Sequence, residues 1–323
     1  MTNDTNEIIL NVSGKTRKVR IPEGWNDLPT DKLLAFYDLL FTAPGDEFTA
    51  SAFTSVKLLS IMQHLLGVGS EFLVQWEAQR IKGDPEFGAL GFLDELRQTM
   101  HYAIKDLFEV NEADGVTTYA AKLNLTKNPW PQLNGPGKNK KQKQRAFYAP
   151  DDELANLTIY ELGMTFSYFE AYLNTGDEEH AHNLIAMLYR PSRPITTKER
   201  ESAWGGDRRQ ALRGYEGKIE ERVKLVKTLP LLVRRVILFW FAGCRQQIVN
   251  TYPKVFKSDS GSGRSTNYGW GGVLLSIAEA GPMGNLNEVS DNHYSNALTY
   301  LSMKADEAEE ARKKAEESSR KRR

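Results

Sequence analysis

One segment, residues 229–249, is far more apolar than the rest of the chain and sets the strongest constraint on the fold. Its uninterrupted apolar part, residues 236–244, is much shorter than the roughly 20 residues that a membrane-spanning helix needs. Arg234 and Arg235 precede this part, and Arg245 follows it. We therefore expect a helix buried in a globular core and no membrane span.

The composition permits such a core and excludes several classes of protein. Of the 323 residues, 40% are hydrophobic and 26% are charged, values that exclude collagenous and disordered chains. The 42 basic residues balance the 42 acidic ones, which argues against a main role in coating nucleic acid or an anionic membrane. The single cysteine, Cys244, excludes an intramolecular disulfide and a zinc site built from cysteines.

Helical spacing of apolar residues dominates most of the chain. Residues 7–12 and 16–21 alternate instead and flank Gly14, which predicts a β-hairpin. Residues 115–125 are also strand-like. The fold class that follows is mainly α, a multi-helix bundle with a small N-terminal β-hairpin. The predicted helices are residues 33–40, 54–66, 70–81, 93–108, 154–173, 177–189, 208–227, 229–249, 268–279 and 290–311.

The length predicts about two domains. Residues 127–149 are rich in proline, glycine and basic side chains, which predicts an exposed loop or linker. This segment separates an N-terminal region, residues 1–126, from a C-terminal helical domain, residues 150–311. Residues 312–323 are highly charged, and we expect them to fray as a tail.

No motif in the sequence defines a catalytic chemistry. Residues 258–266 resemble a phosphate-binding loop only in part, because Arg264 replaces the required lysine and no strand precedes it, so we interpret them as a flexible linker. His180 and His182 are two residues apart on a predicted helix and point to different faces, which favours surface histidines over metal ligands. Cys244 is interpreted as a small buried hydrophobe. We expect no enzyme, cofactor or metal site.

A basic run without acidic residues spans residues 138–145, and the aromatic residues Trp130, Phe147 and Tyr148 flank it. Cations interleaved with aromatic rings can hold phosphates and stack on bases. The same run fits a contact with an acidic protein, or a solvated connector without a partner. The three interpretations stay open. The basic residues are Lys138, Lys140, Lys141, Lys143 and Arg145.

Three patches of sequence share an order of features with a known group of proteins. Residues 21–28, Ile-Pro-Glu-Gly-Trp-Asn-Asp-Leu, lead from the hairpin into a helix. Residues 215–241 join a charged helix, a Leu-Pro break and an apolar helix that contains Phe-Trp-Phe. Residues 270–279 begin with Trp and end with Ile-Ala-Glu, and residues 298–301 read Leu-Thr-Tyr-Leu. Together they resemble tail-region proteins of tailed bacteriophages and prophages of Bacteroidota, including tail assembly chaperones.

The resemblance implies a non-enzymatic protein of phage morphogenesis that acts in tail assembly, as a chaperone or as a tail-associated structural component. Its partners would be tail proteins such as the tape-measure or tail-tube protein. It would act in the bacterial host cytoplasm during assembly, with presence in the virion left open. The main alternative is a nucleic-acid-binding accessory protein that acts through residues 138–145.

A chaperone of this kind needs an apolar groove that covers the apolar stripe of a partner helix. Trp270, Leu274 and Ile277 lie on one helix face, at spacings of four and three residues, and can line such a groove. The alternative is that these three side chains pack into the core of the protein itself, as apolar stripes commonly do.

Overall fold

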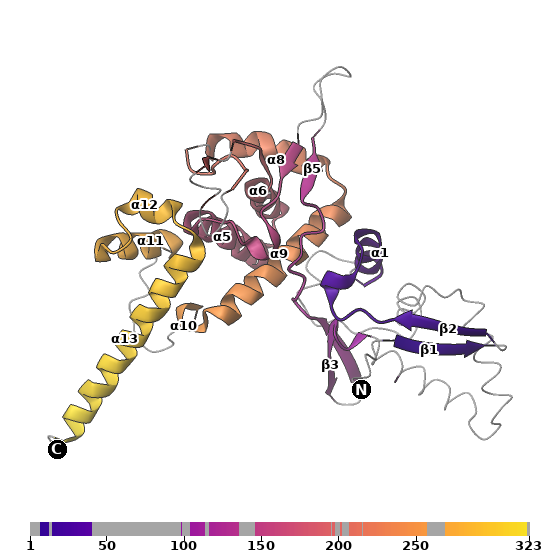
Figure 1. The fold of residues 1–323 in the computed structure, drawn as a ribbon, viewed down its shortest axis with the longest axis horizontal. Helices are drawn as coiled ribbons and strands as arrows, with labels where there is room; N and C mark the ends of the chain where they lie inside the picture. Colours follow the sequence, from indigo (N-terminus) through magenta and orange to yellow (C-terminus); the bar gives the residue numbers. More distant parts are fainter. Residues whose placement is uncertain are drawn as a thin grey trace. The chain divides into compact units, whose positions relative to one another are not determined.

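The fold is described from a computed structural model (Figure 1), which covers residues 7–12, 15–40, 98, 104–113, 116–135, 146–194, 196–197, 201, 207–214, 216–256 and 269–321. The expected helices at 54–66 and 70–81, most of the one at 93–108, the 258–266 linker and the basic run at 138–145 lie outside the described residues. The chain is mainly α-helical, as expected. It forms two compact units: unit 1 is Met1–Leu125 with Leu231–Gly243, and unit 2 is Thr126–Pro230 with Cys244–Arg323.

Unit 1 combines two β-hairpins with helical segments. Strands β1 and β2 are antiparallel, with Glu7 opposite Arg20, and β3 and β4 are antiparallel, with Phe108 opposite Ala121. The elements are β1 (Glu7–Val12), β2 (Lys15–Arg20), the 3-10 helix η1 (Trp25–Asp27), α1 (Thr30–Leu40), β3 (Phe108–Ala113), β4 (Val116–Ala121) and the first part of α9 (Leu231–Thr251).

The core of unit 1 forms around Trp25, whose side chain is fully buried. Its ring meets Phe239, Phe108 and Phe36 edge to face, at centroid distances of 5.2, 5.5 and 6.5 Å, an arrangement that aromatic rings prefer. Phe239 belongs to the apolar part of α9, in which every side chain from residue 236 to 242 is buried. The expectation of a buried core helix is therefore confirmed. None of the helices in the described part of the chain is long and apolar enough to cross a membrane.

Unit 2 packs helices around a small antiparallel sheet in the order β5-β6-β7. Phe147 in the central strand pairs with Leu133 on one side and Pro191 on the other. The elements are β5 (Gln132–Asn134), β6 (Ala146–Tyr148), η3 (Asp152–Leu154), α5 (Ile159–Thr175), α6 (Glu178–Leu188), β7 (Arg190–Pro191), η4 (Glu216–Lys218), α8 (Ile219–Thr228), the end of α9, α10 (Pro253–Phe256), α11 (Gly269–Ala280), α12 (Leu286–Asp291) and α13 (Tyr294–Lys321).

Side-chain caps explain where several of these helices begin and end. Thr158 and Glu161 form a capping box at the start of α5, and Gly176, with φ 69°, ends the helix in the left-handed region. The side chain of Asp177 then caps α6. Asn285 begins α12 with a second capping box. These local signals fix the boundaries before any tertiary packing.

The expectation of β-structure limited to an N-terminal hairpin was too simple, because small antiparallel sheets lie in the middle of the chain. Residues 116–121 of the strand-like segment form β4. Parts of the expected loop at 127–149 are ordered, as β5 and β6, because Leu133 and Phe147 are buried there. The expected domain boundary near residue 126 agrees with unit 1 only in part, since that unit also takes residues from α9.

Two expected helix boundaries also differ from the structure. The charged helix expected at 208–227 begins only at Ile219, because residues 207–209 lie outside the helix and the side chains of Asp207 and Arg209 are buried in the interior. The tail expected to fray from residue 312 continues as helix to Lys321. Ion pairs three and four residues apart support that helix, among them Lys313–Glu309 at 2.7 Å.

Candidate functional site

Trp270, Leu274 and Ile277, the predicted partner-binding residues, lie on α11 and face the chain's own helices. Leu274 is 6% exposed and Ile277 is fully buried. The Trp270 ring packs edge to face on Phe166 of α5, with centroids 5.7 Å apart. It also occupies the space beside Gly163, where a Cβ would come within 2.9 Å of the tryptophan side chain. These three side chains therefore hold α11 against α5.

On the opposite side of α11, an apolar side chain is exposed to solvent. Leu275 is 48% exposed, and Leu286 on the neighbouring helix α12 is 41% exposed. Single exposed leucines are ordinary on protein surfaces, but these two lie on helices that contact one another. We call Leu275 and Leu286 the α11–α12 surface. The other large apolar side chains exposed in the described part of unit 2 are Leu173 on α5 and Met303 on α13.

The most unusual interior feature is a cluster of four buried charged side chains in unit 2: Glu161, Arg190, Asp207 and Arg209. Arg190 donates to Glu161 and, at 3.2 Å, to Asp207. Arg209 binds Asp207 through two nitrogens, Nε to Oδ1 at 2.9 Å and Nη2 to Oδ2 at 2.7 Å. Two positive and two negative charges neutralise one another, which makes their burial tolerable.

This charge cluster links the segment that carries Asp207 and Arg209, which lies outside regular secondary structure, to helices α5 and α6. Arg209 also donates from Nη1 to the Leu188 carbonyl at the end of α6, at 3.0 Å. Glu161 belongs at the same time to the capping box of α5. Burial, followed by the neighbouring Arg209, lowers the pKa of Arg190. Because the four side chains are at most 10% exposed and bind one another, we assign the cluster a structural role.

The basic run at 138–145 lies outside the described residues, but its flanks are defined. Residues on either side of it pair in β5 and β6, with Asn134 opposite Ala146. Phe147 is 8% exposed. The guanidinium of Arg208 lies over the ring of Tyr148, 4.2 Å from the ring centroid. Of the flanking aromatics proposed to stack on bases, Phe147 is therefore buried and Tyr148 already has a cation on its ring.

The two histidines on α6 differ in their surroundings. His182 is 7% exposed, contrary to the expectation of a surface residue, because the helix turns it toward the interior. Its Nδ1 lies 3.5 Å from a carboxylate oxygen of Glu179, which also pairs with Lys227. His180 is half-buried beside the Tyr168 ring. Among the described residues, no three His, Cys, Asp or Glu side chains group closely enough to hold a metal ion.

Cys244 is buried, as expected, in the part of α9 that belongs to unit 2. Its thiol donates to the carbonyl of Thr126 at 3.6 Å. Burial raises the pKa of the thiol well above its ordinary value, and the nearby carboxylates of Glu153 and Asp152 raise it further. A protonated, enclosed thiol is a poor nucleophile.

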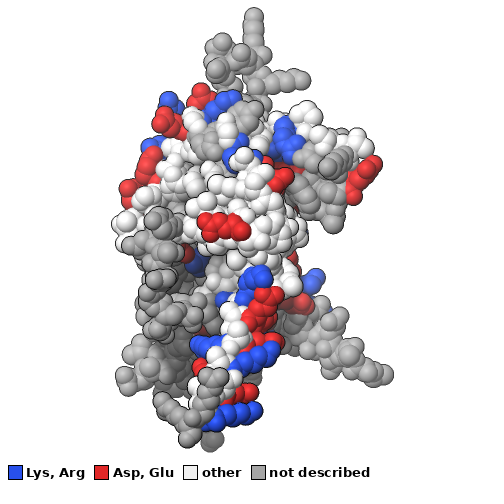
Figure 2. Space-filling model, turned by 90° about the vertical axis from the view of Figure 1, so that its left-hand side faces the viewer, with Lys and Arg blue, Asp and Glu red and all other residues white. Residues whose placement is uncertain are grey.

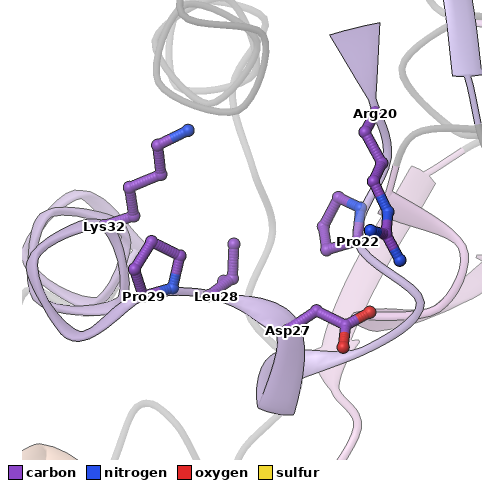
Figure 3. Close-up of a pocket in the computed structure, with 6 residues that line it drawn as sticks. All are labelled: Arg20, Pro22, Asp27, Leu28, Pro29 and Lys32. Atoms are coloured by element: carbon purple, nitrogen blue, oxygen red, sulfur yellow. The ribbon is translucent and has the colours of Figure 1, made fainter.

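Unit 1 contains an open pocket of about 240 Å³ between the end of β2 and the start of α1 (Figure 3). Figure 3 shows Lys32 on one side of it and Arg20 with Pro22 on the other. Asp27 accepts a backbone hydrogen bond from Glu23 at 2.9 Å. The three charged side chains that line the pocket, Arg20, Asp27 and Lys32, are exposed to solvent.

With this geometry established, the chain was compared with known proteins. Comparisons with protein families, with curated proteins and with solved structures return no match.

Proposed function

We propose that the chain is a non-enzymatic morphogenesis protein of tailed bacteriophages that acts in tail assembly, as a chaperone or as a tail-associated structural component. The sequence patches at 21–28, 215–241 and 270–301 support this proposal through their resemblance to phage tail-region proteins. The observation that carries it in the fold is the pair of exposed leucines on the α11–α12 surface.

A tape-measure protein is a long helical chain whose apolar stripe needs cover before the tail tube closes around it. An apolar helix face binds best to a surface that offers apolar side chains from neighbouring helices. Leu275 and Leu286 provide such side chains, while Trp270 fixes α11 on α5 from the other side. Trp270, Leu274 and Ile277, which were first expected to contact the partner, thus support α11 inside the protein. The exposed side chains of Leu275 and Leu286 contact the partner instead.

The test is a pull-down with the tagged protein from cells that produce the phage or prophage, followed by mass spectrometry of the bound proteins. We expect recovery of a tape-measure or tail-tube protein, and loss of that recovery in the double variant Leu275→Asp, Leu286→Asp. The matched control is Leu173→Asp, because Leu173 is 47% exposed on α5, about 15 Å along that helix from Gly163. The control should retain the partner.

Mass spectrometry of purified virions then separates the two roles, since a chaperone leaves the finished tail and a structural component stays. The proposal fails if no tail protein is recovered. It also fails if the aspartate pair and the Leu173 control bind the partner equally. Recovery of nucleic acid alone would favour the alternative role through residues 138–145.

A further inference from the structure

Helix α13 continues far beyond the contacts that hold it to unit 2. Its buried side chains are Tyr294, Ala297 and Leu298, all in the first two turns. Every residue from 306 to 321 is exposed. Figure 1 shows the helix leaving α11 and α12 and continuing to its end, beyond the contact with α10 in which Lys254 pairs with Asp306, and residues 303–321 span about 28 Å.

The charges of this exposed segment are separated along the helix. Residues 306–310 contain four carboxylates and no basic residue, whereas residues 312–321 contain five basic residues and two acidic ones. In Figure 2, red and blue side chains lie along the lower part of the molecule, where Figure 1 places α13. Three ion pairs within the helix use part of this charge, namely Lys304–Glu307, Lys313–Glu309 and Arg312–Glu316, and Asp306 pairs with Lys254 of α10. Glu310, Lys314, Arg320 and Lys321 make no ion pair with the described residues.

From this charge separation we infer that α13 binds α13 of a second copy of the chain, antiparallel, to form a two-fold symmetric dimer. An antiparallel pair places the acidic half of each helix on the basic half of the other, whereas a parallel pair would oppose like charges. A two-fold contact uses the same surface on both copies and closes at two subunits. This inference is independent of the proposed function.

The helix positions give the register of the pair. The face that continues from Leu298 carries the small residues Ala305, Ala308 and Ala315, which allow two helices to approach closely. With the helices centred near Ala311, Ala308 of one copy lies opposite Ala315 of the other. In the same register residues 306–310 of one copy lie alongside residues 312–316 of the other, so the acidic half of each helix meets the basic half of its partner.

The first test is the mass of the full chain in solution, measured by sedimentation equilibrium from micromolar to about 200 µM, a range that detects dissociation constants of weak dimers. We expect a monomer–dimer equilibrium whose dissociation constant rises about tenfold or more between about 50 mM and about 500 mM salt, because exposed charges are screened. A chain that stays monomeric over the whole range overturns the inference.

Charge variants decide whether α13 makes the contact. The pair Glu307→Lys, Glu309→Lys makes the exposed helix basic, and Lys313→Glu, Lys314→Glu makes it acidic, so each variant alone should be monomeric. A mixture of the two variants pairs a basic helix with an acidic helix and should dimerise. The control is Glu220→Lys, Glu221→Lys, at exposed residues of α8, which should leave the dimer intact. Circular dichroism checks that all variants stay folded. Dimers that survive in either charge-reversal variant alone, or a mixture of the two that stays monomeric, contradict the inference.

Disulfide trapping tests the direction of the helices. In the antiparallel register Lys304 lies opposite Ser318 of the second copy. A mixture of Lys304→Cys and Ser318→Cys proteins should therefore cross-link, while each alone should not. The native Cys244 is buried and does not compete. Cross-linking of Lys304→Cys with itself indicates a parallel pair and overturns the proposed geometry.

Discussion

Gly163 leaves the space on α5 that the Trp270 side chain fills, so a single methyl group tests how tightly α11 is held. We expect Gly163→Ala to lower the free energy of unfolding by about 1 to 3 kcal/mol, because the tryptophan would have to move away from a Cβ only 2.9 Å distant. Gly271→Ala, on α11 with open space around it, should instead raise stability by about 0.5 kcal/mol, since alanine favours a helix over glycine. Urea denaturation followed by circular dichroism measures both. Equal effects of the two substitutions would contradict this packing.

The charge cluster gives the second prediction at the scale of the residue. Glu161→Gln removes one of two buried negative charges and leaves Arg190 and Arg209 under-compensated. We expect a loss of about 3 to 5 kcal/mol in the free energy of unfolding. Glu170→Gln, which breaks the much more exposed pair with Arg245, should cost far less. If the two losses were similar, burial of the cluster would not be the cause.

Residue patterns predicted some of these features and missed others, for physical reasons. The burial of Cys244 and the core position of α9 follow from local apolarity, which a sequence displays directly. The cluster of Glu161, Arg190 and Asp207 does not, because charged residues are normally exposed and these partners are 17 and 29 residues apart. Similarly, the orientation of His182 depends on which face of α6 packs against the rest of unit 2.

Among the elements, α5 depends on its first turn. The Thr158 side chain accepts a hydrogen bond from the Glu161 amide at 3.2 Å. We expect Thr158→Ala to cost about 1 kcal/mol, as is typical for loss of an N-cap. In a Glu161→Ala background the further cost should shrink, because the capping box has already lost the side chain that accepts the Thr158 amide hydrogen bond. A double-mutant cycle measures this coupling, and strictly additive effects would contradict a shared role of Glu161.

The boundaries of elements were predictable where a cap or a breaker stands in the sequence. Pro230 precedes α9 and Asp177 precedes α6, close to the expected starts. The first part of the helix expected at 208–227 does not form. Arg209 gains more from its hydrogen bonds to Asp207 and to the Leu188 carbonyl than it would from the backbone hydrogen bonds of a helix. Tertiary contacts of this kind leave no periodic trace in the sequence.

At the scale of the whole molecule, buried acidic groups set the response to alkaline pH. Burial raises the pKa of the Cys244 thiol well above 9.0 and the pKa of Tyr294 from 10.0 to about 12. Above pH 9 the unfolded chain therefore releases protons that the folded chain retains, so the free energy of unfolding falls as pH rises. The slope contributed by Cys244 reaches about 1.4 kcal/mol per pH unit.

Denaturant midpoints from pH 7 to 10.5 measure this fall. Cys244→Ala should flatten the curve between pH 9 and 10, whereas Tyr294→Phe should change it only above pH 10. A wild-type curve that stays level to pH 10 would show that the thiol titrates alike in both states.

Because unit 1 includes part of α9, it cannot be completed until late in translation. Unit 1 needs residues Leu231–Gly243, which leave the ribosome about 118 residues after Leu125. At roughly 5 to 20 residues per second, the nascent N-terminal part waits about 6 to 24 s for this segment. During that interval Trp25 lacks Phe239, and the aromatic side chains around it stay without their cover. The newborn chain is therefore most exposed to aggregation, and most in need of a holdase chaperone, while residues 126–230 are being translated.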